Sequence, residues 1–202
     1  MNVVKKIMLI IGFSAVLLSC SEQEAEGPYK MLANPAPTST PEVLEFFAYF
    51  CPHCYELDKK VDVWKKRLPK SVTFRRVPLT LGTAGGRIYS RVFYISESLG
   101  VLEQSHSAMF QLFHVQKLPV NSELQLKKFF LSLGITEEAF EKALNDPAID
   151  EKVAAAEKLA KAYRIIRVPG FVINGTYFTD VATAGGEKEM FSEIGRLIRK
   201  KK

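Results

Sequence analysis

The sequence predicts an α/β fold that is interrupted by an all-helical insertion. Three observations support this class. The patterns run strand, helix, strand over residues 43–79. After Gly85-Gly86, about seventy residues show only helical patterns. Two short apolar runs around an Asn-Gly pair then precede a closing helix.

The first strand, residues 43–50, is continuously apolar apart from Glu45, as is typical of a strand buried on both faces. A helix follows and ends at Pro69. Because residues 72–79 then have strand character, the crossover helix predicts a parallel pair of strands. The apolar face of that helix is formed by Leu57, Val61, Trp64 and Leu68.

The insertion contains five predicted helices and no predicted strand. We expect its phenylalanines and leucines to form its own core rather than a cofactor pocket. Ser122 and Gln125 have the spacing of a capping box at the start of one helix. The expected helices are residues 87–99, 102–114, 123–133, 137–144 and 148–163.

The last part of the chain predicts a hairpin and a helix. Asn174-Gly175 lies between the apolar triplets 171–173 and 176–178, which is a strong hairpin signal. Residues 187–200 then carry an apolar stripe at helical spacing.

A pair of cysteines lies where the first strand leads into the first helix, in Cys51-Pro52-His53-Cys54. The first backbone N–H groups of a helix have no partner within the helix and stabilise an anion. We therefore expect a thiolate at Cys51, with His53 donating to it or adding positive charge nearby. The alternatives are a surface histidine without influence on the sulfurs, an inert structural disulfide, or half of a zinc site.

A zinc site needs further ligands, and the other histidines are His106 and His114. Both are distant in sequence from the cysteine pair and lie on a predicted helix. We expect both to be packing or surface residues.

Residues 1–19 read as an export signal, with Lys5 and Lys6 before an apolar stretch that is too short for a confident transmembrane helix. Its end, Leu17-Leu18-Ser19-Cys20, resembles the lipobox of bacterial lipoproteins. The resemblance implies cleavage before Cys20 and lipid attachment to that residue. An ordinary secretory signal with a chance cysteine is the alternative.

Removal of the signal would take away Lys5 and Lys6 and lower the formal net charge from +6 to about +4, which is a mild excess. Part of it is a cluster of cations at residues 196–202, which suits a solvated helix end. Together with export, this argues against a nucleic-acid partner. Residues 21–40 are rich in Glu, Ala, Pro, Ser and Thr, and we expect a flexible tether there.

The order of elements, the Cys-x-x-Cys motif and Val168-Pro169 before the hairpin together resemble the thioredoxin fold. The helical insertion narrows this resemblance to the DsbA family of exported thiol oxidases. It extends from about Pro41 to the C-terminus. It implies a thioredoxin-like domain of residues 41–80 and 164–202 and a helical insertion of residues 81–163, preceded by the signal (1–19) and by the anchor and tether (20–40).

The resemblance also implies roles for individual residues. Cys51 would be the sulfur that substrates attack, and Cys54 the resolving thiol. Glu45 would exchange a proton with Cys54 from beneath the dithiol, its pKa raised by burial; the alternative is an edge residue facing solvent.

Substrate contacts are implied at Val168, Pro169 and Pro52. A cis bond before Pro169 rests on the resemblance, since most X–Pro bonds are trans. Gly170 departs from the small hydroxyl residue or alanine expected after that proline, and it would loosen the loop or widen the groove.

The implied activity is oxidation of reduced exported proteins at the extracytoplasmic face of a bacterial membrane or in the periplasm, by a monomer that needs no cofactor beyond the Cys51–Cys54 disulfide. A membrane quinone reductase of the DsbB type would reoxidise it. A reductase or isomerase on the same fold, and a lipid-anchored metal carrier or holdase, are the competing functions.

Overall fold

The computed structural model describes residues 27–200 and contains one five-stranded sheet with the strand order β1-β5-β4-β2-β3. β2 and β3 are parallel, as the crossover predicted, and the other neighbours are antiparallel. The first predicted strand is shorter than expected, because it ends at Phe47. The strands are β1 (Lys30–Met31), β2 (Glu42–Phe47), β3 (Thr73–Pro78), β4 (Gly170–Ile173) and β5 (Tyr177–Thr179).

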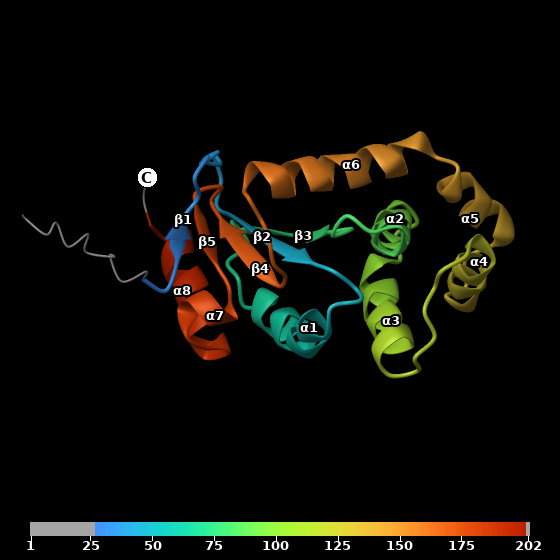
Figure 1. Ribbon diagram of the computed structural model, residues 1–202, viewed down its shortest axis with the longest axis horizontal. Coiled ribbons are helices and arrows are strands. Elements are labelled where there is room, and N and C mark those ends of the chain that lie inside the picture. Colours follow the sequence, from blue (N-terminus) through green and yellow to red (C-terminus); the bar gives the residue numbers. More distant parts are fainter. Residues whose placement is uncertain (1–26, 201–202) are drawn as a thin grey trace, which may run out of the picture.

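Helices cover both faces of the sheet (Figure 1). α1 (Pro52–Lys65) and α8 (Glu187–Ile198) lie on one face, and α6 (Pro147–Ala162) runs across the other. A compact apolar layer fills the space between α1, α8 and the sheet. It consists of Val43, Leu57, Val61, Phe171, Ile173, Met190, Ile194, Leu197 and Ile198.

All five helices predicted in the insertion are present: α2 (Ala84–Ser98), α3 (Leu102–His114), α4 (Glu123–Ser132), α5 (Glu137–Leu144) and α6. The side chain of Ser122 caps α4 by accepting from the Gln125 N–H group, as its spacing predicted. The apolar residues of the insertion join the core on one face of the sheet in a single cluster. The insertion therefore shares its core with the sheet instead of forming a separate one.

The hairpin between β4 and β5 follows the Asn-Gly prediction. Asn174 and Gly175 both have positive φ, 52° and 60°, as a tight turn of this kind requires. A Cβ atom on Gly175 would lie 1.9 Å from the carbonyl oxygen of Ala36, so glycine is also required for space.

The predicted tether is in part held by the sheet. β1 pairs with β5, and the Leu32 N–H group donates to the Thr176 carbonyl at 2.9 Å. A two-residue strand has too little periodicity to be predicted, but it covers what would otherwise be an open sheet edge. The short helix α7 (Val181–Ala184) was also not predicted. The predicted signal and Cys20 lie outside the described residues.

Candidate active site

Cys51 occupies the N-cap position of α1. Its backbone is extended (φ −83°, ψ 118°), and its carbonyl accepts the first helical bond from the Tyr55 N–H group at 3.1 Å. Pro52 follows at the first position of the helix, where the missing N–H costs nothing, and is exposed. The sulfur therefore sits where a helix has unpaired N–H groups and the positive end of its dipole.

The surroundings of Cys51 lower the pKa of its thiol from 9.0 to about 6. The largest cause is a hydrogen bond from the Cys54 side chain. Burial opposes it, the backbone N–H groups of Cys54 and His53 add to it, and the charge of His53 contributes least. At neutral pH Cys51 is therefore mostly a thiolate.

Cys54 is the opposite case, because it is buried within the first turn of α1. Burial raises the pKa of its thiol, and the neighbouring Cys51 thiolate raises it further. Both cysteines are free thiols in this structure. The pair thus combines one accessible, acidic sulfur with one buried sulfur that keeps its proton.

His53 is exposed at the start of α1. We predicted that His53 helps to stabilise the Cys51 thiolate. Both its backbone N–H group and its charge lower the pKa of Cys51, which agrees with this prediction. Its charge is a minor cause, because water screens an exposed charge.

The loop before β4 faces the dithiol. The peptide bond between Val168 and Pro169 is cis, as the resemblance to thioredoxin-like proteins implied. The Cys51 thiol donates to the Val168 carbonyl oxygen at 3.6 Å. A Cβ atom on Gly170 would lie 2.8 Å from the ring of Phe178, which explains why this chain has glycine where a slightly larger residue was expected.

Glu45 is buried at 2% exposure, so the edge position that faces solvent is excluded. Side chains two residues apart on a strand lie on the same face, so Glu45 lies on the same face of β2 as Val43. α1 covers this face. Burial raises the pKa of its carboxyl group, and Arg76 on the neighbouring strand, 2.9 Å from it, counteracts this in part.

Arg76 connects Glu45 to two carboxylates of α1. Its Nη2 atom lies 2.9 Å from Asp58 and 3.0 Å from Asp62. Asp58 in turn lies 3.0 Å from the Nε2 atom of His106. Buried charges need partners, and here each carboxylate pairs with Arg76. The cluster therefore forms a charged layer between β2, β3 and α1, the helix that contains Cys54.

Neither Arg76 nor Asp58 was identified from the sequence, in which each is one polar residue of a predicted strand or helix. The parallel register, in which Arg76 lies opposite Glu45, brings them together. The available signal was the single acidic residue in an apolar strand, which requires a buried cation nearby.

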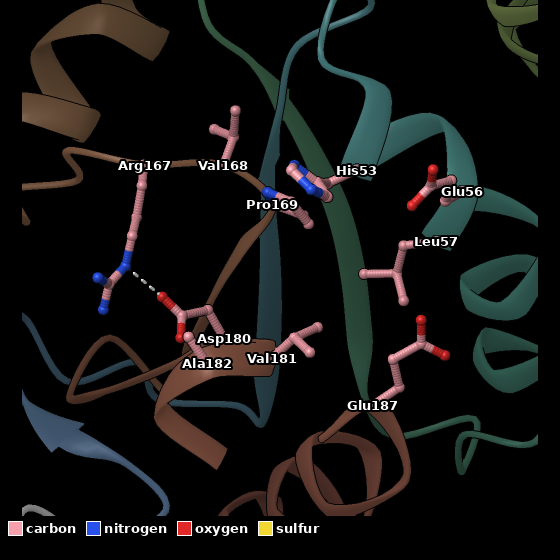
Figure 2. Close-up of a pocket in the computed structure, with 10 residues that line it drawn as sticks. All are labelled: His53, Glu56, Leu57, Arg167, Val168, Pro169, Asp180, Val181, Ala182 and Glu187. Carbon is pink, nitrogen blue, oxygen red and sulfur yellow. Dashed lines mark hydrogen bonds and ion pairs between the residues drawn. The ribbon is translucent and has the colours of Figure 1, made fainter. Parts of the chain in front are cut away.

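An apolar cavity of about 420 Å³ adjoins the dithiol. Figure 2 shows Leu57, Val181 and Pro169 around it, and His53 beside Pro169. The carboxylates of Glu56 and Glu187 border one side, while Arg167 pairs with Asp180 on the opposite side. The cavity extends from the cis-proline loop to α1.

Within residues 27–200, no group of three or more His, Cys, Asp and Glu side chains is arranged to hold a metal ion. Across the same residues, no helix has both the length and the apolar character needed to span a bilayer.

Comparison with known proteins identifies relatives of the whole folded region. A family model described as a DSBA-like thioredoxin domain matches residues 42–191. The chain is 34% identical to the thiol:disulfide interchange protein DsbA of Pseudomonas aeruginosa over 177 residues, which cover 86% of this chain and 83% of that protein. The DsbA of Azotobacter vinelandii is 32% identical over 198 residues, covering 96% and 92% of the two chains.

Solved structures agree with these relatives. The crystal structure of Pseudomonas aeruginosa DsbA superimposes with a TM-score of 0.79 at 33% identity, covering 85% of this chain and 91% of that one. A DsbA from Proteus mirabilis, solved with a non-covalently bound peptide, has the same fold (TM-score 0.77, 23% identity, 86% and 97% covered). The matched residues include the dithiol, the cis-proline loop and the insertion, and the chain therefore belongs to the family of DsbA-like thioredoxin domains.

Proposed function

We propose that this protein is an exported thiol:disulfide oxidoreductase that donates the Cys51–Cys54 disulfide to reduced proteins. The observation that carries the proposal is the asymmetry of the two thiols: the pKa of Cys51 is lowered to about 6, whereas that of Cys54 is raised. Stabilising the reduced form as a Cys51 thiolate makes the disulfide form a stronger oxidant.

The reaction has two exchanges. A substrate thiolate attacks the Cys51 sulfur, the Cys51–Cys54 bond breaks, and Cys54 leaves and takes up a proton. A second substrate thiolate then attacks the substrate sulfur of the mixed disulfide, and Cys51 leaves as a thiolate. Two electrons pass from the substrate to the protein; of the two substrate protons, one goes to Cys54 and the other to solvent. The low pKa of Cys51 speeds the second exchange.

Glu45 is proposed as the group that hands Cys54 its proton and takes it back on reoxidation. The raised pKa of its buried carboxyl group supports this role. The negative charge of Glu45 also contributes to the raised pKa of Cys54, which indicates that the two groups are close enough to influence each other.

Substrate binding is proposed at the cis-proline loop and the adjoining cavity. The Val168 carbonyl accepts from the Cys51 thiol in this structure, and a Cys51 thiolate has no hydrogen to donate. The carbonyl then becomes free to accept from the backbone of an extended substrate. Pro169, which lines the cavity, and Pro52, which is exposed at the start of α1, are proposed as further substrate contacts. The peptide complex of the Proteus mirabilis relative suggests a cysteine-containing peptide as probe.

Two cysteine variants test the chemistry. Cys51→Ser is expected to abolish oxidation of a reduced dithiol peptide, and retained activity would remove Cys51 as the attacked sulfur. Cys54→Ser is expected to accumulate mixed disulfides that a reductant releases, visible on a non-reducing gel. If none forms while the variant is folded, Cys54 is not the resolving thiol.

Lipid anchoring at Cys20 and reoxidation by a membrane quinone reductase of the DsbB type complete the proposal, which places the protein in the periplasm or at an extracytoplasmic membrane face. The resemblance of Leu17-Leu18-Ser19-Cys20 to a bacterial lipobox supports the anchor. Cys20→Ser is expected to move the protein from the membrane fraction to the soluble fraction, with the mass of the lipid missing. An unchanged distribution and mass would contradict the anchor.

A further inference from the structure

Two histidines of α3 contact the residue that lies two positions before Cys51. The Nδ1 atom of His106 lies 2.9 Å from the Tyr49 hydroxyl, and the Nε2 atom of His114 lies 2.7 Å from the Tyr49 carbonyl oxygen. Tyr49 is 1% exposed and His106 is 2% exposed. One helix of the insertion therefore holds both the side chain and the backbone of Tyr49.

The same two rings also reach α1 beyond the dithiol. His106 lies 3.0 Å from Asp58, one turn after Cys54. The ring of His114 stacks on Tyr55, with centroids 4.8 Å apart and an interplanar angle of 11°. α3 thus contacts the chain on both sides of Cys51-Pro52-His53-Cys54.

The hydrogen-bond partners of His106 and His114 determine which ring nitrogen carries a hydrogen. Asp58 is paired with Arg76 and accepts, so Nε2 of His106 carries the hydrogen and Nδ1 accepts from the Tyr49 hydroxyl. Burial lowers the pKa of His106, which keeps it neutral, as this arrangement requires. His114 donates from Nε2, because a carbonyl oxygen only accepts.

We propose that His106 and His114 are positioning residues of the dithiol: through them, α3 of the insertion fixes the backbone from Tyr49 to Asp58 in the geometry in which Cys51 reacts. This gives the insertion a direct part in the exchange reaction, in addition to covering the sheet.

The geometry of the site explains why such fixation matters. The Cys51 sulfur is stabilised by the Cys54 side chain and by two N–H groups of the first helical turn. Each of these interactions depends steeply on distance and direction. Apolar packing alone is non-directional, whereas four polar or stacking contacts from two rings define where the segment lies.

The inference rests on the proposed role of Cys51, and three variants and one control test it. His114→Leu removes the donor to the Tyr49 carbonyl, and His114→Gln keeps an N–H donor. Tyr49→Phe removes only the hydroxyl that His106 accepts from and leaves both rings in the core, so it tests this contact even if a His106 variant fails to fold. Phe140→Leu, in the core of α5 and 1% exposed, is the matched control for lost stability.

The measurement is the pKa of Cys51, from thiolate absorbance in the reduced proteins. His114→Leu and Tyr49→Phe are each expected to raise it by about half a unit to one unit, because one hydrogen bond contributes an energy of that order. His114→Gln is expected to restore most of the loss. Phe140→Leu is expected to lower the melting temperature and leave the pKa of Cys51 unchanged.

If His114→Leu and Tyr49→Phe lower only the melting temperature, as Phe140→Leu does, the two histidines are ordinary packing residues and the inference is overturned. Equal shifts in all three variants would overturn it too, since the pKa of Cys51 would then follow stability alone. The proposed function fails separately, by retained activity of Cys51→Ser, whatever these titrations show.

Discussion

The two sides of α1 are held in different ways. Toward the sheet and α8, it buries Leu57 and Val61 in a purely apolar layer. Toward β3 and the insertion, it presents Asp58 to Arg76 and His106, and Tyr55 to His114. The apolar side supplies most of the burial and hence stability. The polar side supplies direction, and its contacts flank the turn that contains Cys51 and Cys54.

The largest expected effect comes from breaking the charged layer. Arg76→Leu leaves Glu45 and Asp58 buried without their cation, and we expect a loss of about 3–5 kcal/mol in the free energy of unfolding. Urea denaturation measures it. The neighbouring Arg75, 55% exposed and paired with Glu42, is the control, and Arg75→Leu is expected to cost less than about 1 kcal/mol. Equal costs for both would show that the buried cluster is not special.

A substitution that creates a cavity on the apolar side of α1 is the counterpart of Arg76→Leu on the polar side. Ile194→Ala in α8, where Ile194 has no exposed surface, is expected to cost about 2–4 kcal/mol. The pKa of Cys51 is expected to stay where it is, because apolar packing does not direct the first turn of α1. A pKa shift comparable to that of a polar-side variant would remove the distinction between the two sides.

The reduced and oxidised forms are expected to differ in their pH dependence. The pKa of Cys51 is lowered in the folded state, so the thiolate stabilises the reduced form fully above the unfolded pKa, near 9, and this stabilisation is lost as the pH falls through about 6. Discounted for the partial exposure of Cys51, we expect about 1–2 kcal/mol.

Denaturation of both redox forms between pH 5 and pH 9 measures this difference. Groups such as Glu45 and His106 titrate in both forms, so their contribution largely cancels. A gap between the two forms that does not change with pH would contradict a stabilised thiolate.

The smallest expected effect concerns His53. Because its charge contributes least to the low pKa of Cys51 and the Cys54 side chain contributes most, His53→Leu is expected to raise the pKa of Cys51 less than Cys54→Ala does. Thiolate titration of both variants ranks them. The reverse order would mean that the exposed imidazole, not the first helical turn, controls the sulfur.

The elements that depend on local sequence patterns could be predicted from the sequence. The continuous apolar run of β2, the spacing in α1 and the Asn174-Gly175 turn are local patterns, and each predicted the type of its element, although β2 ends three residues earlier than predicted. The position of Cys51 at a helix start was likewise readable, since the cysteine motif itself lies between a strand and a helix.

The polar surroundings of the dithiol could not be read in this way. Arg76, Asp58 and His106 come from a strand, a helix and the insertion, and their meeting depends on the parallel register of β2 and β3 and on how α3 crosses α1. His106 and His114 were expected to be packing or surface residues, because eight residues of spacing on a helix contain no information about what the helix packs against. β1 was missed for a related reason: it exists only through its partner β5.

The most direct test of this account is the titration of Cys51 in the reduced wild-type protein, read from thiolate absorbance against pH with Cys51→Ser as the blank. We expect a midpoint near pH 6. A midpoint near that of free cysteine, about 8.5, would show that the first turn of α1 does not stabilise the thiolate, and would contradict the role of this dithiol as a disulfide donor.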